Sequence, residues 1–258
     1  MSTFLWESIA FGPIHSRRLG SSLGINLLPT DVKICSFNCI YCECGWTLEK
    51  SLTAREYYPV ETVMQAIEHK LQETLAAGKA VDSITFSGNG EPTLHPHFDE
   101  IINRLLALRD TYFPKAVITC LSNATQLMRP EVCAALKKIE NPLLKLDAGT
   151  QEMLQIINDP VIPVFIDEVV RELCSFNGNL VIQSMFLSGE KDGIPFDNSM
   201  EPNLSAWLEK IALIKPRKVM IYSLDREAPA AKLHKFSKER LEQIADLVRA
   251  LDITAETY

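Results

Sequence analysis

The chain of 258 residues lacks any apolar run long enough to cross a lipid bilayer. Its longest runs, such as residues 180–187, fall far short of the roughly 20 residues that a membrane-spanning helix needs. Its start, Met-Ser-Thr-Phe-Leu-Trp-Glu, also lacks the basic residues and the long apolar stretch of a secretory signal. These absences predict a cytoplasmic protein without a membrane partner, in a compartment where thiols stay reduced.

Basic residues are also fewer than acidic ones: the chain has 26 Lys and Arg and 33 Asp and Glu, which gives a net charge of −7. This balance argues against a broad nucleic-acid surface, although it is compatible with a local basic patch. The sequence has no Pro-, Gly- or Ser-rich linker, low-complexity tract or repeat, and its 47% hydrophobic content suffices for one sizeable core. We therefore expect a single domain over residues 1–258, with its core at about 20–225 and a C-terminal helix at about 237–252.

Six short runs are nearly continuous in apolar residues, as is typical of parallel strands buried on both faces. Because helical patterns separate them, the sequence predicts an α/β fold, a single-domain partial (β/α)6 barrel with parallel strands. Such sheets carry their functional residues at the carboxyl ends of the strands. The expected strands are 24–28, 83–86, 116–121, 143–147, 180–186 and 218–222; the expected helices are 60–75, 98–106, 130–136, 164–173, 204–214 and 237–251; and 188–202 is expected to be a polar lid or connection.

Cysteine is scarce but concentrated, because four of the seven cysteines lie in "ICSFNCIYCEC", residues 34–44. Cys35, Cys39 and Cys42 have the spacing C-x3-C-x2-C in a loop at 34–45 that follows the first expected strand and precedes the first helix. Thiolates suit zinc or an iron–sulfur cluster. A structural zinc site usually has two ligand pairs, and no second pair is visible, but Cys44 keeps open a non-enzymatic module with four thiolates on zinc.

The three-cysteine spacing, with Tyr41 just before the third cysteine, resembles the signature of the radical S-adenosylmethionine enzymes. The resemblance implies that Cys35, Cys39 and Cys42 bind a 4Fe–4S cluster whose open iron binds S-adenosylmethionine, and that Cys44 is a bystander. Reductive cleavage of that cofactor would release a 5′-deoxyadenosyl radical. Tyr41 would lie near the adenine, and an electron donor such as flavodoxin or ferredoxin would be a partner.

The second expected strand runs into "FSGNGEPTLHP", residues 86–96, where glycines allow a backbone to approach a ligand closely. The stretch resembles the family's Gly-Gly-Glu-Pro motif, and it departs from that motif by having Asn89 between the two glycines. The resemblance implies that Gly88, Asn89, Gly90 and Glu91 contact the cofactor. Without the resemblance, a Gly-Asn-Gly stretch indicates only a tight loop.

Polar residues also end the next expected strands. Ser122 and Asn123 follow the third strand as a cap or turn, and the resemblance implies that they reach the methionine carboxylate or the ribose. Lys145 and Asp147 flank one leucine in the fourth strand, so they share a face, and buried charges need a partner or a function. They form either a structural ion pair, or a site in which Asp147 binds the ribose and Lys145 holds the substrate or forms an imine. Gln183 on the fifth strand points to the same rim.

Two further pairs are candidate substrate residues. Arg17 and Arg18, in "FGPIHSRRLGSSLGINLLP", suit phosphate or carboxylate, or are simply exposed in a loop. Asp225 and Arg226 follow the sixth strand in "YSLDREAP". The order of these motifs, from about residue 11 to about residue 230, is similar to that of compact iron–sulfur oxidoreductases related to the tRNA wyosine-base synthases.

That similarity implies a tRNA base as the leading substrate class. The chain has no cysteine before Cys35 for the second cluster of those synthases, and its acidity disfavours a tRNA body. A glycyl-radical activating enzyme, acting on a partner protein, and a radical enzyme for a small anionic metabolite are the alternatives, beside the zinc module. The sequence leaves the substrate and the abstracted atom open.

Overall fold

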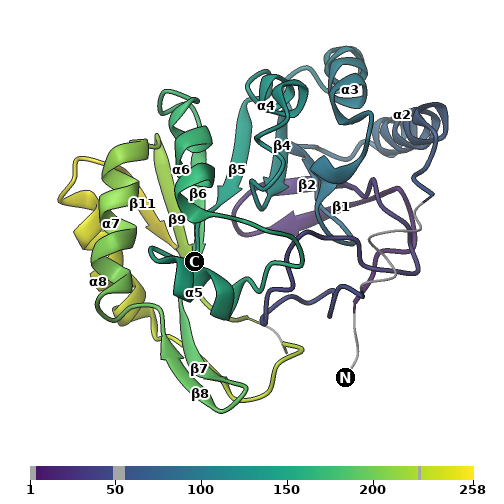
Figure 1. The fold of residues 1–258 in the computed structure, drawn as a ribbon. Coiled ribbons are helices and arrows are strands. Elements are labelled where there is room, and N and C mark those ends of the chain that lie inside the picture. The colour runs from purple at the N-terminus through teal and green to yellow at the C-terminus, as the bar shows by residue number, and fades with distance from the viewer. Residues whose placement is uncertain (1–3, 49–55, 226–227) are drawn as a thin grey trace.

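A curved, eight-stranded sheet forms the centre of the protein in the computed structural model, which describes residues 4–48, 56–225 and 228–258 (Figure 1). The strand order is β1-β2-β3-β4-β5-β6-β9-β11; every pair from β2 to β11 is parallel, and only β1 pairs antiparallel. The α/β class and the partial barrel of parallel strands are thus confirmed. The strands are β1 Ala10–Ser16, β2 Gly20–Ile25, β3 Ser83–Phe86, β4 Val117–Ser122, β5 Asn141–Lys145, β6 Val181–Met185, β9 Lys218–Tyr222 and β11 Ala255–Thr257.

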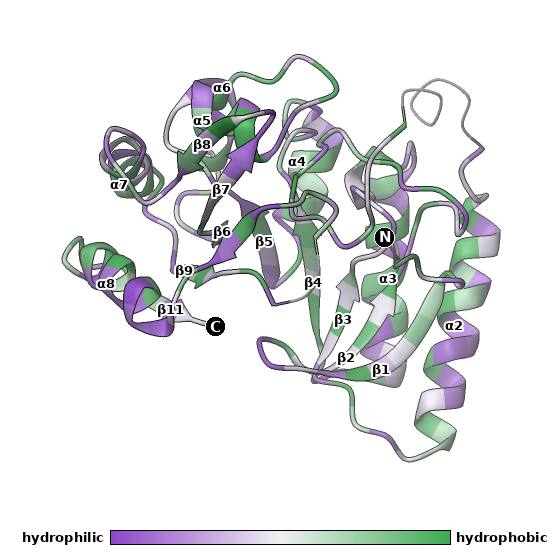
Figure 2. Ribbon diagram, turned by 90° about the horizontal axis from the view of Figure 1, so that it is seen from below, coloured by the Kyte–Doolittle hydropathy of each residue, from purple (hydrophilic) through white to green (hydrophobic). Residues whose placement is uncertain are grey.

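The barrel is open on one side. Among the described residues, β1 and β11 are the edge strands and do not pair with each other. Helices lie along the outer face of the curved sheet (Figure 2). They are α2 Val60–Ala76, α3 Phe98–Tyr112, α4 Pro130–Leu136, α5 Gln151–Ile157, α6 Ile166–Cys174, α7 Asn203–Ile214 and α8 Lys238–Arg249, with a short 3₁₀ turn at Pro92–Leu94. Of the helices in the described ranges, none is both long and apolar enough to cross a membrane.

Helix α7 packs closely against the residues that follow β5. Trp207 is fully buried, and its Nε1 donates to the Leu146 carbonyl oxygen over 2.9 Å. A Cβ added at Gly149 would lie 2.2 Å from the Trp207 main-chain nitrogen, so only glycine allows this approach. Asn203 Oδ1 accepts from the Gly149 amide over 2.7 Å and fixes the turn that follows β5.

The first parallel strand begins earlier than expected. It covers Gly20–Ile25 in place of 24–28, because its polar residues pair across the sheet instead of ending it. The Ser22 and Thr85 hydroxyls lie 2.8 Å apart, and Ser83 connects Thr85 to Thr119 over 2.9 and 2.8 Å. These hydrogen bonds satisfy the buried hydroxyls. In the sequence, the same serines and threonines interrupt the apolar run and so hide the start of the strand.

The expected lid or connection at 188–202 is largely a β-hairpin. Strands β7 (Leu187–Lys191) and β8 (Ile194–Asp197) pair antiparallel, and β10 (Leu233–Lys235) extends them to a three-stranded sheet. Charged residues such as Glu190 and Lys191 obscure its strand pattern, and β10 comes from a distant part of the chain. The edge strands β1 and β11 and helix α5 were not expected either.

Candidate active site

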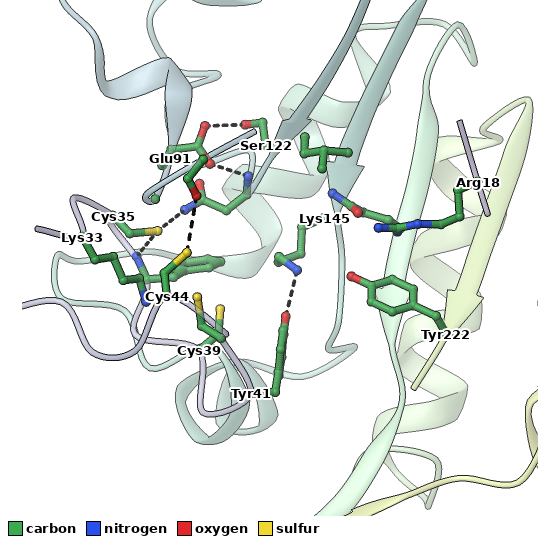
Figure 3. A pocket seen from close by; sticks show the side chains of 17 residues that line it. Arg18, Lys33, Cys35, Cys39, Tyr41, Cys44, Glu91, Ser122, Lys145 and Tyr222 are labelled. Atoms are coloured by element: carbon green, nitrogen blue, oxygen red, sulfur yellow. Dashed lines mark hydrogen bonds between the residues drawn. The ribbon is translucent and has the colours of Figure 1, made fainter. Parts of the chain in front are cut away.

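A cavity of about 230 Å³ lies between the cysteine loop and the carboxyl ends of the strands (Figure 3). The loop between β2 and α2 forms one wall, and the residues that end β3 to β6 and β9 form the others. The structure therefore brings together most of the residues singled out in the sequence. Of the expected site residues, the cavity is lined by Arg18, Cys35, Cys39, Tyr41, Cys42, Gly88, Gly90, Glu91, Ser122, Asn123, Lys145 and Gln183.

The cysteine loop is attached to the turn after β3 through a glycine. Ile34 N donates to the Asn89 carbonyl and Glu91 N donates to the Ile34 carbonyl, both over 2.9 Å. Gly90 has a φ of +133°, and a Cβ there would lie 1.8 Å from the Ile34 carbonyl oxygen. A side chain at position 90 would therefore push the loop, and the cysteines with it, away from the sheet.

Asn89 supports this arrangement from behind the cavity. Its side chain donates to the carbonyls of Trp6 and Pro29, each over 2.9 Å, and accepts from Trp6 N over 2.8 Å. Its own amide donates to Asn26 over 3.1 Å. The structure thus does not bring Asn89 into the cavity, in contrast to the cofactor contact implied by the resemblance. It shows Asn89 joining the N-terminal segment to the cysteine loop.

The sulfurs of the first two cysteines are buried beside amide donors. Asn123 Nδ2 lies 3.5 Å from Cys35 Sγ, and Asn158 Nδ2 lies 3.4 Å from Cys39 Sγ. Burial raises the pKa of Cys35 to about 12, against the opposing charge of Lys33. Hydrogen bonds of this kind stabilise negative charge on cysteine sulfur and tune the potential of a cluster bound there.

The third cysteine lies beside another thiol and a buried cation. A hydrogen bond from Cys44, opposed by burial and aided by the charge of Lys33, lowers the pKa of Cys42 to about 5. Lys33 is 3% exposed, and its Nζ donates to the Gly45 carbonyl over 2.8 Å. Burial alone would lower the pKa of Lys33, but the charges of the three cysteines raise it. A lysine that stays protonated here offsets thiolate charge.

This donor set fits a cluster of four irons with three protein ligands. Three thiols from one loop share a cavity with amide donors and one buried cation. In the described parts of the chain, no three His, Cys, Asp or Glu side chains are close enough together to hold a single metal ion. Cys44 lines the same cavity, and its thiol lies 3.4 Å from the Gly88 carbonyl oxygen.

Glu91 joins the carboxyl ends of β3 and β4. It is 2% exposed; one oxygen accepts from Ser122 Oγ over 2.8 Å, and the other accepts from the Asn123 amide over 2.6 Å (Figure 3). Thr93 also donates its amide, over 3.1 Å. Burial raises the pKa of Glu91, and these donors oppose the shift. The carboxylate therefore positions the two strand ends that face the cysteines.

Lys145 and Asp147 form an ion pair, one of the two alternatives for these residues, with Nζ and Oδ2 3.3 Å apart. Asp147 is 1% exposed and also accepts from Tyr41 OH, from Asn158 Nδ2 and from the Met185 amide, the last two over 2.8 Å. Burial would lower the pKa of Lys145, but the Asp147 charge raises it well above its usual value. An imine needs a neutral amine, so this environment opposes that role for Lys145.

A second cavity, of about 410 Å³, occupies the open side of the barrel. Arg17 and Asp225 line it and form an ion pair of 2.6 Å, with side chains 64% and 51% exposed. Arg18, Leu121 and Tyr222 line both cavities, so the two adjoin there. The expected substrate residue Arg226 lies outside the described residues.

Sequence reasoning missed several residues of the site. Lys33 stands two positions before Cys35, and a lysine this close to clustered thiols was an available signal. Tyr222 ends the sixth expected strand and could have been found from that position. Asn158 gave no signal, because it follows α5, an element that was not expected.

Comparisons with known proteins agree with this geometry. Residues 31–195 match the family model described as the radical SAM superfamily. A UPF0026 protein of Methanocaldococcus jannaschii is 32% identical over 188 residues, which cover 71% of this chain. The matched region spans 56% of the length of that relative, so the chain matches only about half of it.

Solved structures show the same fold at low identity. A radical SAM methyltransferase from Sphaerobacter thermophilus superposes with a TM-score of 0.65 at 15% identity, over 92% of this chain and 65% of that one. Archaeal TYW1 superposes with a TM-score of 0.50 at 12% identity, over 89% of this chain and 71% of that one. At these identities, the likeness concerns the fold alone.

Proposed function

Because the chain belongs to the radical SAM superfamily, we propose that it cleaves S-adenosylmethionine reductively at a 4Fe–4S cluster and modifies a substrate with the resulting radical. Membership supports the general chemistry, and Cys35, Cys39 and Cys42 would hold the cluster. The observation that carries the proposal is the position of these three cysteines on one wall of a cavity bordered by strand ends. When bound, the cluster and the cofactor supply the electron and the 5′-deoxyadenosyl radical.

The protein's own residues would bind and orient these groups. Lys33, Asn123 and Asn158 would stabilise charge on the sulfurs. The main chain at Gly88 and Gly90 faces the same cavity as Gln183, and Gln183 is only 5% exposed. We propose that these residues contact the cofactor together with the other cavity-lining residues expected from the resemblance, Tyr41, Glu91, Ser122 and Asn123, with Asp147 holding Tyr41 in place.

For the substrate, we propose a tRNA base that enters through the second cavity. The support is the motif order shared with the wyosine-base synthases and the contact of the second cavity with the first. An enzyme recognises an extruded base by stacking and by polar contacts in a small pocket. Such recognition does not require a broad basic surface on the protein. A flavodoxin or ferredoxin would deliver the electron.

An anaerobic assay for 5′-deoxyadenosine tests the proposal. The reconstituted, reduced protein should form it from S-adenosylmethionine, and tRNA from the source cell should change its rate or its products. Cys39→Ala protein is the matched control and should form none. A colourless protein that contains zinc and no iron would overturn the proposal. Activity without any response to tRNA would direct the search to a small metabolite or to a glycyl-radical protein.

A further inference from the structure

The opening of the barrel lies between segments from the two ends of the chain. The turn between β1 and β2 supplies Arg17 and Arg18, and Tyr258, just after β11, lies on the other side. The strands that would close a complete barrel do not meet here in the described chain, and the second cavity adjoins the first where Arg18, Leu121 and Tyr222 line both. A group that spans the two cavities would therefore lie beside Arg18.

Arg18 is held firmly in the turn. Ser16 Oγ accepts from the amides of Arg18 and Leu19 over 3.3 and 3.2 Å, which fixes the turn. The guanidinium carbon lies 5.0 Å from the centre of the Tyr222 ring. Figure 3 shows Arg18 beside Tyr222, across the cavity from the cysteines. The side chain is therefore placed at the junction of the two cavities, away from the cluster ligands.

One nitrogen of Arg18 has no partner. Its Nη1 is buried and, within the described residues, is the only such side-chain atom without a hydrogen bond. Buried guanidinium groups normally have acceptors, because removing their donors from water without compensation is unfavourable. An unsatisfied donor beside two cavities indicates a ligand acceptor.

Two cationic residues near Arg18 differ from it, because each lies close to a carboxylate. Arg17, on the same turn, is paired with Asp225 at 2.6 Å, and Lys235 lies 3.6 Å from the same carboxylate. His15 and Glu43 also line the second cavity. No described carboxylate forms an ion pair with Arg18 within 4.0 Å, so its charge remains available to an incoming anion.

We propose that Arg18 binds an oxyanion of the substrate, a phosphate or a carboxylate, at the junction of the two cavities. This inference rests on the proposed function and names a recognition element of its substrate. The planar guanidinium suits two-oxygen groups of both kinds. The Tyr222 ring lies against the guanidinium, and Nη1 is left without an acceptor that a bound anion would supply. An anion held there would position the rest of the substrate toward the first cavity.

Anion titration of the reconstituted protein tests this proposal. The anaerobic protein, with S-adenosylmethionine present, is titrated calorimetrically with sodium phosphate and separately with sodium acetate at constant ionic strength. Wild type should bind at least one probe saturably, and Arg18→Gln should weaken that binding by about 10-fold or more. A preference for phosphate would favour a nucleotide, and a preference for acetate would favour a carboxylic acid.

Arg17→Gln is the matched control, because it removes the same charge from the same turn. It should weaken probe binding by less than about threefold, since Asp225 already pairs with Arg17. Equal losses in the two variants, or the absence of saturable binding of both probes to wild type, would overturn the proposal. So would a loss of S-adenosylmethionine affinity in Arg18→Gln as large as the loss of probe affinity, which would assign Arg18 to the cofactor.

Circular dichroism shows whether Arg18→Gln folds. If it does not fold, a second variant tests the proposal. Arg18→Lys keeps the charge above Tyr222 but lacks the planar fork, and we expect it to weaken probe binding about 3- to 10-fold. Affinity equal to that of wild type in this variant would also contradict the proposal. Formation of 5′-deoxyadenosine by wild type tests the proposed function separately, because probe binding requires no radical.

Discussion

The cysteine cavity and the opening of the barrel differ in how their polar groups are satisfied. In the first, Glu91 and Asp147 are almost fully buried, and each accepts hydrogen bonds from several donors. In the second, the Arg17–Asp225 pair is more than half exposed and Arg18 Nη1 has no partner. A satisfied, buried network holds one geometry, whereas exposed pairs exchange readily with water and ligands. The proposed site of cofactor cleavage thus lies in the buried, satisfied network, and the proposed substrate contact lies beside the more exposed pair.

Removing a thiol from the cysteine cavity should have the largest effect. Cys35→Ala, Cys39→Ala and Cys42→Ala should each abolish the cluster, because these three thiolates are the full protein ligand set in the proposed function. Cys44→Ala should retain it and is the matched control. Iron and acid-labile sulfide after anaerobic reconstitution are the measurement. Loss of the cluster in Cys44→Ala alone would reassign the ligands.

Lys145→Ala should separate cofactor cleavage from substrate turnover. Lys145, at the end of β5, borders the first cavity, and its Nζ donates to the Tyr41 hydroxyl of the cysteine loop over 2.8 Å. Tyr41 also bonds to Asp147, so it keeps a partner when Lys145 is removed. We expect substrate-dependent turnover to fall by about 100-fold, as is typical when a positioning contact is lost, and uncoupled 5′-deoxyadenosine formation to fall much less. Quantifying both products by chromatography checks this. An equal collapse of both would place Lys145 in cofactor binding.

Asp147→Asn should destabilise the folded protein strongly. The change leaves the buried Lys145 cation without its counter-charge at 3.3 Å. Breaking a buried pair in this way costs about 3–5 kcal/mol in the free energy of unfolding. Urea denaturation of the protein measures it. Asp225→Asn, in the exposed pair of the opening, is the matched control, and an equal loss in the two variants would remove the contrast between the two regions.

Arg17→Gln should change stability least. The distance between Arg17 Nη2 and Asp225 Oδ2 is short, 2.6 Å, but both side chains are more than half exposed. Such pairs contribute about 0–1 kcal/mol, and salt screens them. The loss, measured by urea denaturation, should shrink further when the ionic strength is raised. A large, salt-independent loss would show that the pair closes the opening structurally.

Much of the rigid region was predictable from local sequence. Nearly continuous apolar runs located β3, β4, β5, β6 and β9, because parallel strands covered on both faces have few polar positions. Cysteine spacing located the loop, since its ligands lie close together in the chain. The edge strands β1 and β11 were missed because each has only one neighbour and a less apolar pattern.

The sequence by itself determined the type of fold and the group that the cysteine loop is suited to hold. Apolar periodicity and thiol spacing are short-range properties that survive in any compact arrangement of the chain. Only the tertiary structure decided which of two adjacent arginines is paired and which is not, and that Lys33 is buried beside three thiols. The physical reason is that partnership and burial depend on how segments pack in space. Asp225 lies 208 residues from Arg17, and the cavity that encloses Lys33 and the cysteines includes residues from distant strand ends.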